Sequence, residues 1–365
     1  MLRHLLKHLP EHCLTGVLTL AWCLSQAVAA DYPAPVEGDY IAKDFHFAVG
    51  RTLPELKLHY RTLGAPRRDP KGQVLNAVLI LHGTGGTGGQ FIRDEFAGEL
   101  FSPGGVLDAS VYYLILPDGI GHGHSSKPSD GLRAAFPHYG YEDMVQAQHL
   151  LLTEGLGLNH LRLVMGTSMG GMHTWLWGER YPGFMDALMP LASLPTQISG
   201  RNRLWRRVII DAIRRDPAWQ GGNYAKQPPS LATASEMLMF MSSNPPLRQQ
   251  QMPTIADADA AIDAAIASGE HSADANDTLY QLEASEDYDP GPGLEKIQAP
   301  LLAVNSADDL INPPELGILE REIRRVPKGS MVLIPFGPGT RGHGSHTVAA
   351  LWKDRLQALL RSTER

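Results

Sequence analysis

The segment around Ser168 has the residue types and the spacing of a nucleophile turn. An apolar run at 161–165 leads into Gly166-Thr-Ser168-Met169-Gly170, and a helix-forming segment follows directly. Glycines two residues before and two after a serine let a strand turn sharply into a helix, which lifts the hydroxyl clear of the sheet. We therefore predict that Ser168 attacks a carbonyl group and that the Met169 N–H, at the positive end of the helix dipole, receives the oxyanion.

Such a serine needs a histidine to take its proton and an acid to hold that histidine. The acid candidates lie in Asn-Ser-Ala-Asp308-Asp309-Leu-Ile-Asn-Pro, and we prefer Asp309 because a proline follows it four residues on. The base candidates lie in Gly-His343-Gly-Ser-His346, and we prefer His343 because it follows a glycine and lies nearer the preceding strand. Asp308 is then expected to cap a helix or form an Asx turn. His346 is kept as the alternative base and is otherwise expected to pack.

The run His82-Gly83-Thr84-Gly-Gly86, which follows an apolar strand, is expected to supply the second oxyanion donor. We assign this role to the Thr84 N–H. The glycines also suit a phosphate cradle, but no Gly-Lys-Ser/Thr follows and the spacing of a dinucleotide-binding loop is missing. We therefore predict no nucleotide cofactor.

Two further clusters suit metal ions, and we interpret both differently. His122-Gly-His124 has a spacing that would bind a metal from a strand, but it lies in a glycine-rich loop, where packing is the preferred interpretation. Four methionines between residues 237 and 252 form a soft-metal set or a flexible apolar pocket wall, and we prefer the wall. The prediction is that the protein needs no metal.

Strand and helix patterns alternate along most of the chain. An alternating hairpin is expected at 40–48 and 55–60, followed by apolar strands at 77–81, 111–116, 161–165, 187–192, 300–305 and 331–335. Helices are expected at 141–154, 169–181, 314–326 and 347–361. This order predicts an α/β fold with a mostly parallel, twisted sheet flanked by helices.

The alternation is interrupted between residues 193 and 298. Only helices are expected there, at 201–215, 236–242 and 255–268. We interpret this segment as a helical cap over the C-terminal edge of the sheet, where open α/β sheets bind ligands. The predicted division is a core at 31–192, the cap at 193–298 and the rest of the core at 299–365.

Residues 1–30 have the pattern of a signal peptide. Arg3 and Lys7 precede a short apolar run, and small residues allow cleavage near Ala29 and Ala30. We predict a periplasmic or secreted protein without a stable membrane anchor after cleavage, since the run is too short to span a bilayer stably. Both cysteines lie in this segment, so the mature chain would hold no disulfide. The net charge of −7 argues against nucleic acid as a partner.

Several runs of the sequence resemble the homoserine O-acetyltransferase branch of the α/β-hydrolases. They begin at Phe101 (FSPGGVLD), Asp143 (DMVQAQ), Gly166 (GTSMGGM) and Asp216 (DPAWQGGNY). The resemblance covers roughly residues 40–360. It implies the α/β-hydrolase fold with a helical cap, the triad of Ser168, Asp309 and His343, and two-step acyl transfer through an acyl-Ser168 intermediate.

The family's substrate contacts are only partly present. Family members hold the homoserine carboxylate with an arginine two residues before an Ala-Ile pair, and Ile210 stands at that position here. They place an aspartate after the catalytic histidine, where this chain has Gly344, and a glycine where it has Thr167. Arg206 and Arg207 lie one turn away from Ile210 and are candidates to compensate for the missing guanidinium.

These departures favour water as the acyl acceptor, and so does the predicted export, because acetyl-CoA is not expected in a periplasm. We therefore predict hydrolysis of a small carboxylic ester. The second interpretation is O-acyl transfer from a donor to a hydroxyl acceptor, and a third is a ligand-binding protein with a vestigial triad. The expected partner is a small-molecule ester or acyl substrate, and a homodimer is left open.

Overall fold

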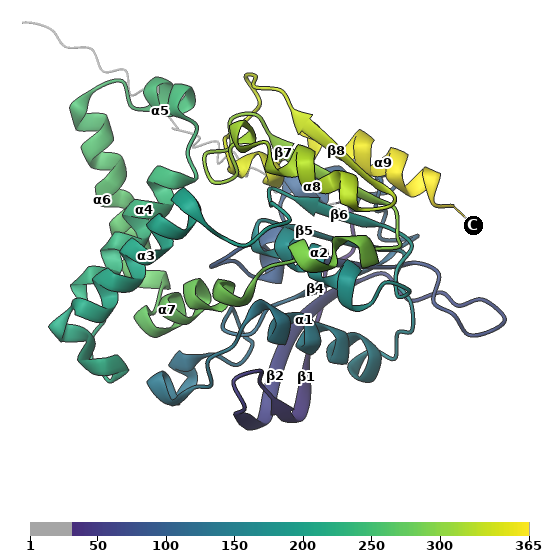
Figure 1. Cartoon of the computed structure of the whole chain (residues 1–365), viewed down its shortest axis with the longest axis horizontal. Coiled ribbons are helices and arrows are strands. Elements are labelled where there is room, and N and C mark those ends of the chain that lie inside the picture. Colours follow the sequence, from purple (N-terminus) through teal and green to yellow (C-terminus); the bar gives the residue numbers. More distant parts are fainter. Residues whose placement is uncertain (1–30, 365) are drawn as a thin grey trace, which may run out of the picture.

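The computed structural model describes residues 31–364, apart from the side chains of 269–272. Its centre is one eight-stranded sheet in the order β1-β2-β4-β3-β5-β6-β7-β8 (Figure 1). The hairpin of β1 (Val36–His46) and β2 (Thr52–Leu63) is antiparallel, and β2 pairs antiparallel with β4 (Tyr113–Pro117). All other strand pairs are parallel, so the predicted α/β sheet is confirmed. The predicted signal peptide lies outside the described residues.

The central strands are apolar because both faces of the sheet are covered. β3 (Ala77–Leu81), β5 (Leu163–Thr167) and β6 (Leu188–Leu191) are buried along their whole length. Successive residues of a strand point to opposite faces. Leu79 and Leu81 accordingly join the cluster with α1 (Tyr141–Leu150) and α2 (Met169–Arg180), whereas Val78 and Ile80 join the cluster with α9 (Lys353–Ser362).

The last two strands are followed by shorter helices than the sequence predicts. β7 (Leu301–Ser306) and β8 (Gly329–Ile334) form the far edge of the sheet. The helix expected at 314–326 is divided into α8 (Ile318–Glu322) and 3₁₀ turns on either side, and the left-handed conformation of Gly317 separates α8 from the first of these turns. The final α-helix begins at Lys353 rather than near Thr347, because Trp352 leaves the helical region with φ −141° and packs edge-on against Phe96.

Five α-helices lie between β6 and β7, and we call them the cap helices. They are α3 (Gly200–Arg215), α4 (Ala232–Met241), α5 (Pro245–Gln251), α6 (Ile255–Ser272) and α7 (Ala275–Glu283). Figure 1 shows α3 to α6 gathered beside the sheet rather than on its faces. The helices α5 and α7 are short and had not been predicted. No helix within residues 31–364 has the length and apolar character that a bilayer span requires.

Candidate active site

Ser168 stands at a strained turn between β5 and α2. Its φ of 56° and ψ of −113° lie outside the regions that residues with side chains normally adopt. The flanking glycines are required by close backbone contacts: a Cβ on Gly166 would lie 2.2 Å from the Gly170 carbonyl oxygen, and one on Gly170 would lie 2.0 Å from that of Leu81. The sequence pattern therefore has a steric cause, and the turn leaves the serine partly exposed.

His343 lies between the serine and an aspartate. Its Nε2 is 2.9 Å from Ser168 Oγ, and its Nδ1 is 2.8 Å from Asp309 Oδ2. A carboxylate only accepts hydrogen bonds, so Nδ1 carries the proton and Nε2 is left to accept the one from the serine hydroxyl. The structure thus brings together three residues that are far apart in the chain, in the arrangement that the sequence analysis assigned to them.

Asp309 is buried and kept ionised by its neighbours. Burial alone would raise its pKa, but the charge and the hydrogen bond of His343, with the N–H groups of Ile311 and Asn312, hold the pKa below its ordinary value of 3.8. The Asn312 side chain also donates to Asp309 Oδ2 at 3.2 Å and to the Ala192 carbonyl at 2.8 Å. Asn312 was missed in the sequence, although an Asn before Pro at the end of the acid's turn is a detectable signal.

Asp308 and His346, the alternative acid and base, lie outside the triad. The structure corrects the expectation for Asp308: Asp309 itself forms the Asx-type bonds to Ile311 and Asn312. Asp308 instead accepts from the Gly342 N–H at 3.0 Å, since its side chain points toward the loop at residues 336–346, which carries His343 and which we call the histidine loop. His346 packs against His343 with ring centroids 5.0 Å apart, and its Nδ1 is buried without a hydrogen-bond partner among residues 31–364.

The two expected oxyanion donors belong to segments that adjoin Ser168. Met169 is the first residue of α2, so its N–H has no intrahelical acceptor. Gly83 lies against the serine, because a Cβ on it would be 3.4 Å from Ser168 Cβ. No hydrogen bond from the Thr84 N–H is found within residues 31–364. Both amides are therefore available to an oxygen atom at this position.

His82 fixes the peptide that carries the Thr84 N–H. Its Nδ1 is 2.8 Å from the Gly83 carbonyl oxygen, and its Nε2 accepts from the Gly119 N–H at 2.9 Å. The same carbonyl accepts from Gly86 N–H at 3.0 Å. Because the C=O and N–H of a trans peptide point in opposite directions, anchoring the Gly83 oxygen turns the Thr84 N–H the other way.

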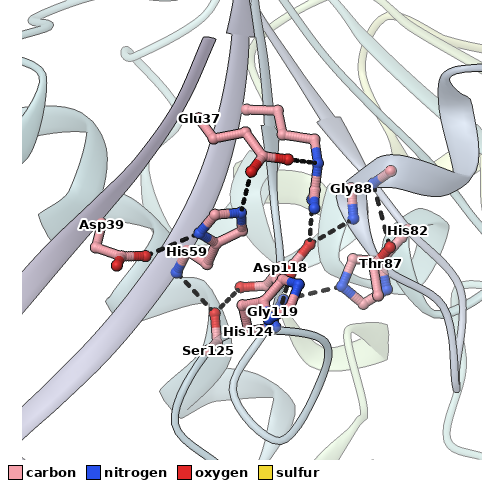
Figure 2. A network of polar contacts seen from close by, with 12 residues as sticks. Glu37, Asp39, His59, His82, Thr87, Gly88, Asp118, Gly119, His124 and Ser125 are labelled. Atoms are coloured by element: carbon pink, nitrogen blue, oxygen red, sulfur yellow. Dashed lines mark hydrogen bonds and ion pairs between the residues drawn. The ribbon is translucent and has the colours of Figure 1, made fainter. Parts of the chain in front are cut away.

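A polar network lies beside this loop and includes His82, Gly88 and Asp118 (Figure 2). The fully buried Asp118 accepts from Gly88 N–H at 2.8 Å and from Arg61 at 3.0 Å, while Arg61 also pairs with Glu37 at 2.9 Å. The network joins β1, β2 and the segments after β3 and β4. It was not predicted, because its members are far apart in the chain.

The residues considered as metal ligands make other contacts. The Nδ1 of His122 lies 2.9 Å from the Ile120 carbonyl oxygen, and the His124 N–H donates to Asp118. Within the part of the chain that the structure describes, no three His, Cys, Asp or Glu side chains are placed to hold a metal ion. Met239 and Met252 line a hollow of about 570 Å³ beside Leu310, the residue after Asp309.

The residues predicted to meet the substrate differ in burial. Ile210 is 1% exposed and belongs to the apolar core. Arg207 is exposed and paired with Asp211, so its charge already has a partner. Arg206 is 2% exposed and donates to Asn202 and Ser285, and burial lowers its pKa.

Buried hydroxyl groups near Arg206 connect it to residues 82–86, the segment that carries the Thr84 N–H and that we call the oxyanion loop. The Tyr141 hydroxyl has no hydrogen-bond partner of good geometry among the described residues, and neither has Thr84 Oγ1. Burial raises the pKa of Tyr141, and the nearby Arg206 and Thr84 oppose that rise. Thr84, Tyr141 and Arg206 therefore lie close together, with hydrogen-bonding capacity left over.

Comparison with known proteins agrees with this architecture. The model of the α/β-hydrolase fold family matches residues 76–336. The chain belongs to this family, and it is an enzyme of the hydrolase or acyltransferase type. Within the family it resembles the homoserine O-acetyltransferases, as the motifs had indicated.

Two curated relatives and one solved structure illustrate the resemblance. A probable acyltransferase of Methanothermobacter thermautotrophicus is 30% identical over 302 residues, which are 82% of this chain and 91% of the relative. The homoserine O-acetyltransferase of Chlorobium chlorochromatii is 35% identical over 207 residues, which are about half of either chain, 53% and 54%. The crystal structure of esterase E22 superposes with a TM-score of 0.78 at 19% identity, over 90% of this chain and 100% of that one, which shows a shared fold.

Proposed function

We propose that this protein hydrolyses a small carboxylic ester through an acyl-Ser168 intermediate. The observation that carries the proposal is the position of His343, within hydrogen-bond distance of both Ser168 Oγ and Asp309 Oδ2. A hydroxyl whose proton can pass to an imidazole held by a carboxylate is an activated nucleophile.

The proposed reaction has two halves. Ser168 Oγ attacks the ester carbonyl carbon while His343 Nε2 takes its proton, and the carbonyl electron pair moves onto oxygen. The Met169 and Thr84 N–H groups bind this oxyanion, where one such donor is commonly worth about 3 kcal/mol. The oxyanion then collapses, the alcohol leaves with the proton from His343, and the acyl group remains on Ser168. Water attacks in the same way, and the acid is released.

Two features support water as the acceptor. The positions of the family's substrate-binding arginine and aspartate hold Ile210 and Gly344, which offer no charged partner to an amino acid. The predicted export of the chain would separate it from acetyl-CoA. Localisation itself remains a prediction, because the signal-peptide pattern lies outside the described residues.

The proposal is tested with purified mature protein. A fluorophosphonate is expected to label Ser168, and p-nitrophenyl acetate is expected to be hydrolysed, with both reactions abolished in Ser168→Ala. A wild-type protein that neither labels nor hydrolyses any short ester would contradict the proposal and favour a ligand-binding role.

A second candidate is acyl transfer to an alcohol that carries a carboxylate, and one observation favours it. No carboxylate within residues 31–364 forms an ion pair with the buried Arg206, and a buried guanidinium gains most from an anionic partner. Homoserine is such an alcohol, and two relatives carry acyltransferase names. Acetyl transfer from acetyl-CoA to homoserine faster than ester hydrolysis, and its loss in Arg206→Gln, would establish this candidate.

A further inference from the structure

Asp308, the neighbour of the triad's acid, joins three parts of the molecule. Its Oδ1 accepts a hydrogen bond from Ser306 in β7, and its Oδ2 accepts from the Gly342 N–H at 3.0 Å and from Asn244 Nδ2. Burial alone would raise its pKa, but these hydrogen bonds, together with the Thr340 side chain, outweigh burial and lower it. The carboxylate is therefore ionised, and its bonds are charge-assisted. We call Asp308 and these three partners the Asp308 junction.

Asn244 brings the cap helices into the junction. It is the N-cap of α5, and its Oδ1 accepts from the Leu247 N–H at 2.9 Å. Because the side-chain oxygen is engaged in this way, the Nδ2 group is directed toward Asp308. Asn244 is 2% exposed and Asp308 is partly buried, so removing the amide donor would take away one of the hydrogen bonds that Asp308 Oδ2 accepts in a place of limited solvent access.

Gly342 brings the histidine loop into the junction. It adopts φ +62°, and a Cβ on it would lie 2.8 Å from the Ser243 carbonyl oxygen and 3.1 Å from the Asn244 nitrogen. The backbone of Ser243 and Asn244, just before α5, thus packs directly on Gly342. The Asn244 side chain is also linked to Gly342 through Asp308. Displacing Gly342 would move the His343 imidazole, whose two hydrogen bonds require fixed positions.

We propose that Asp308 is a positioning residue for His343, and that the junction couples the seating of α5 to the placement of the imidazole. The inference rests on the proposed function, in which His343 activates Ser168. Asp308 acts through Gly342 and does not touch the reacting atoms. Loosening the junction therefore slows acylation of the serine, whereas binding of a small ester is preserved.

The test uses two matched substitutions in the cap helices. Asn244→Asp keeps an N-cap acceptor for Leu247 but sets a carboxylate against Asp308. Thr254→Asp is the control: Thr254 exchanges hydrogen bonds with Asp257 at the start of α6, so this variant also sets an acid against an acid. The Thr254 bonds stay within residues 254–257, whereas the Asn244 bond reaches the histidine loop through Asp308. Asp308→Asn completes the set.

The readouts are the second-order rate of fluorophosphonate labelling at Ser168, kcat and KM for p-nitrophenyl acetate, and Tm. We expect Asn244→Asp and Asp308→Asn to lower the labelling rate and kcat at least about tenfold with KM within about twofold, because a misplaced base slows chemistry more than binding. Thr254→Asp is expected to remain within about twofold of wild type. Equal rates in the two cap variants, whatever their common value, would overturn the proposal.

Failure of the proposed function would look different. Wild-type protein would then not label at Ser168, and hydrogen exchange of residues 336–346 would decide the role of the junction. Faster exchange in Asn244→Asp than in Thr254→Asp would support the coupling, and equal exchange would overturn it.

Discussion

Asp308 and Asp309 are chemically alike and adjacent, yet their surroundings separate them. Asp309 faces His343 and is 1% exposed, whereas Asp308 turns toward Gly342 and the cap helices. From the sequence, the proline spacing selected the aspartate that lies against His343. The partners of Asp308 were not predictable, because Asn244 lies on a distant segment whose position depends on the packing of the cap helices.

Replacing Asp309 by asparagine tests the triad directly. The amide of the new side chain would no longer fix the His343 tautomer with the proton on Nδ1, so Nε2 would lose its role as acceptor from Ser168. We expect kcat to fall by about 10⁴ with little change in Tm, as the side-chain volume is conserved. Unchanged kcat in Asp309→Asn would transfer the role of the acid to another residue.

His346 offers the complementary test at the other end of the triad. Burial lowers its pKa to about 3, so it remains neutral near pH 7, and no oxygen of Ser168 or Asp309 is bonded to its ring among the described residues. His346→Phe keeps the ring that packs on His343 and is expected to retain labelling of Ser168 within about fivefold. His343→Ala should abolish labelling. Equal losses in the two variants would contradict this assignment.

The segment between β3 and α1 supplies a similar test for the oxyanion loop. His82 anchors the Gly83 carbonyl, and burial lowers the pKa of His82, so it stays neutral and keeps its acceptor for Gly119. We expect His82→Leu to lower kcat about 100-fold, because the Thr84 N–H loses its fixed direction. The matched control is His122→Leu, whose ring lies 4.9 Å from that of His82. The His122 side chain is buried like that of His82, but among the described residues it forms no hydrogen bond to the oxyanion loop, so kcat should fall much less in His122→Leu.

The elements of the sheet were predictable because their signals are local. The continuous apolar runs of β3, β5 and β6 follow from burial on both faces, and Gly166 and Gly170 follow from the contacts of the turn. The helices α5 and α7 escaped prediction because they are short and only partly apolar. Asn-Pro-Pro at 244–246 is nevertheless a recognisable start for α5, since Asn caps a helix and Pro suits its first turn.

The site was predictable in residue type but only partly in geometry. Strand ends at the same edge of a parallel sheet bring the serine, the acid and the histidine together, so their order along the chain was informative. Two other parts of the site depend on contacts between residues far apart in the chain: the network of Asp118, Arg61 and Glu37, and the Asp308 junction. No local pattern in the sequence encodes such pairings.

The helix behind the nucleophile also links the whole molecule's stability to pH. The buried His173 and the partly buried Glu179, both on α2, have pKa values displaced in opposite directions. Burial, with the neighbouring His82 as a smaller cause, lowers the pKa of His173 from 6.5 to about 3, and its Nδ1 lies 3.2 Å from Gln148 Nε2, which donates to it. Burial, with the charge of Glu142, raises the pKa of Glu179 from 4.5 to about 8.

The fold loses stability at low pH because of His173 and at high pH because of Glu179. The unfolded chain protonates at His173 first, so its contribution to stability is lost as the pH falls from about 6.5 toward about 3. The folded chain keeps the Glu179 proton longer, so that contribution is lost as the pH rises from about 4.5 toward about 8. We therefore expect the Tm of Glu179→Gln to rise relative to that of wild type as the pH rises through this range.

For His173 the trend is reversed. The Tm of His173→Gln should rise relative to that of wild type as the pH falls below about 6.5. Thermal unfolding of wild type and the two variants from pH 4 to pH 9 measures both trends. Curves of Tm against pH that run parallel for all three proteins would contradict the displaced pKa values of His173 and Glu179.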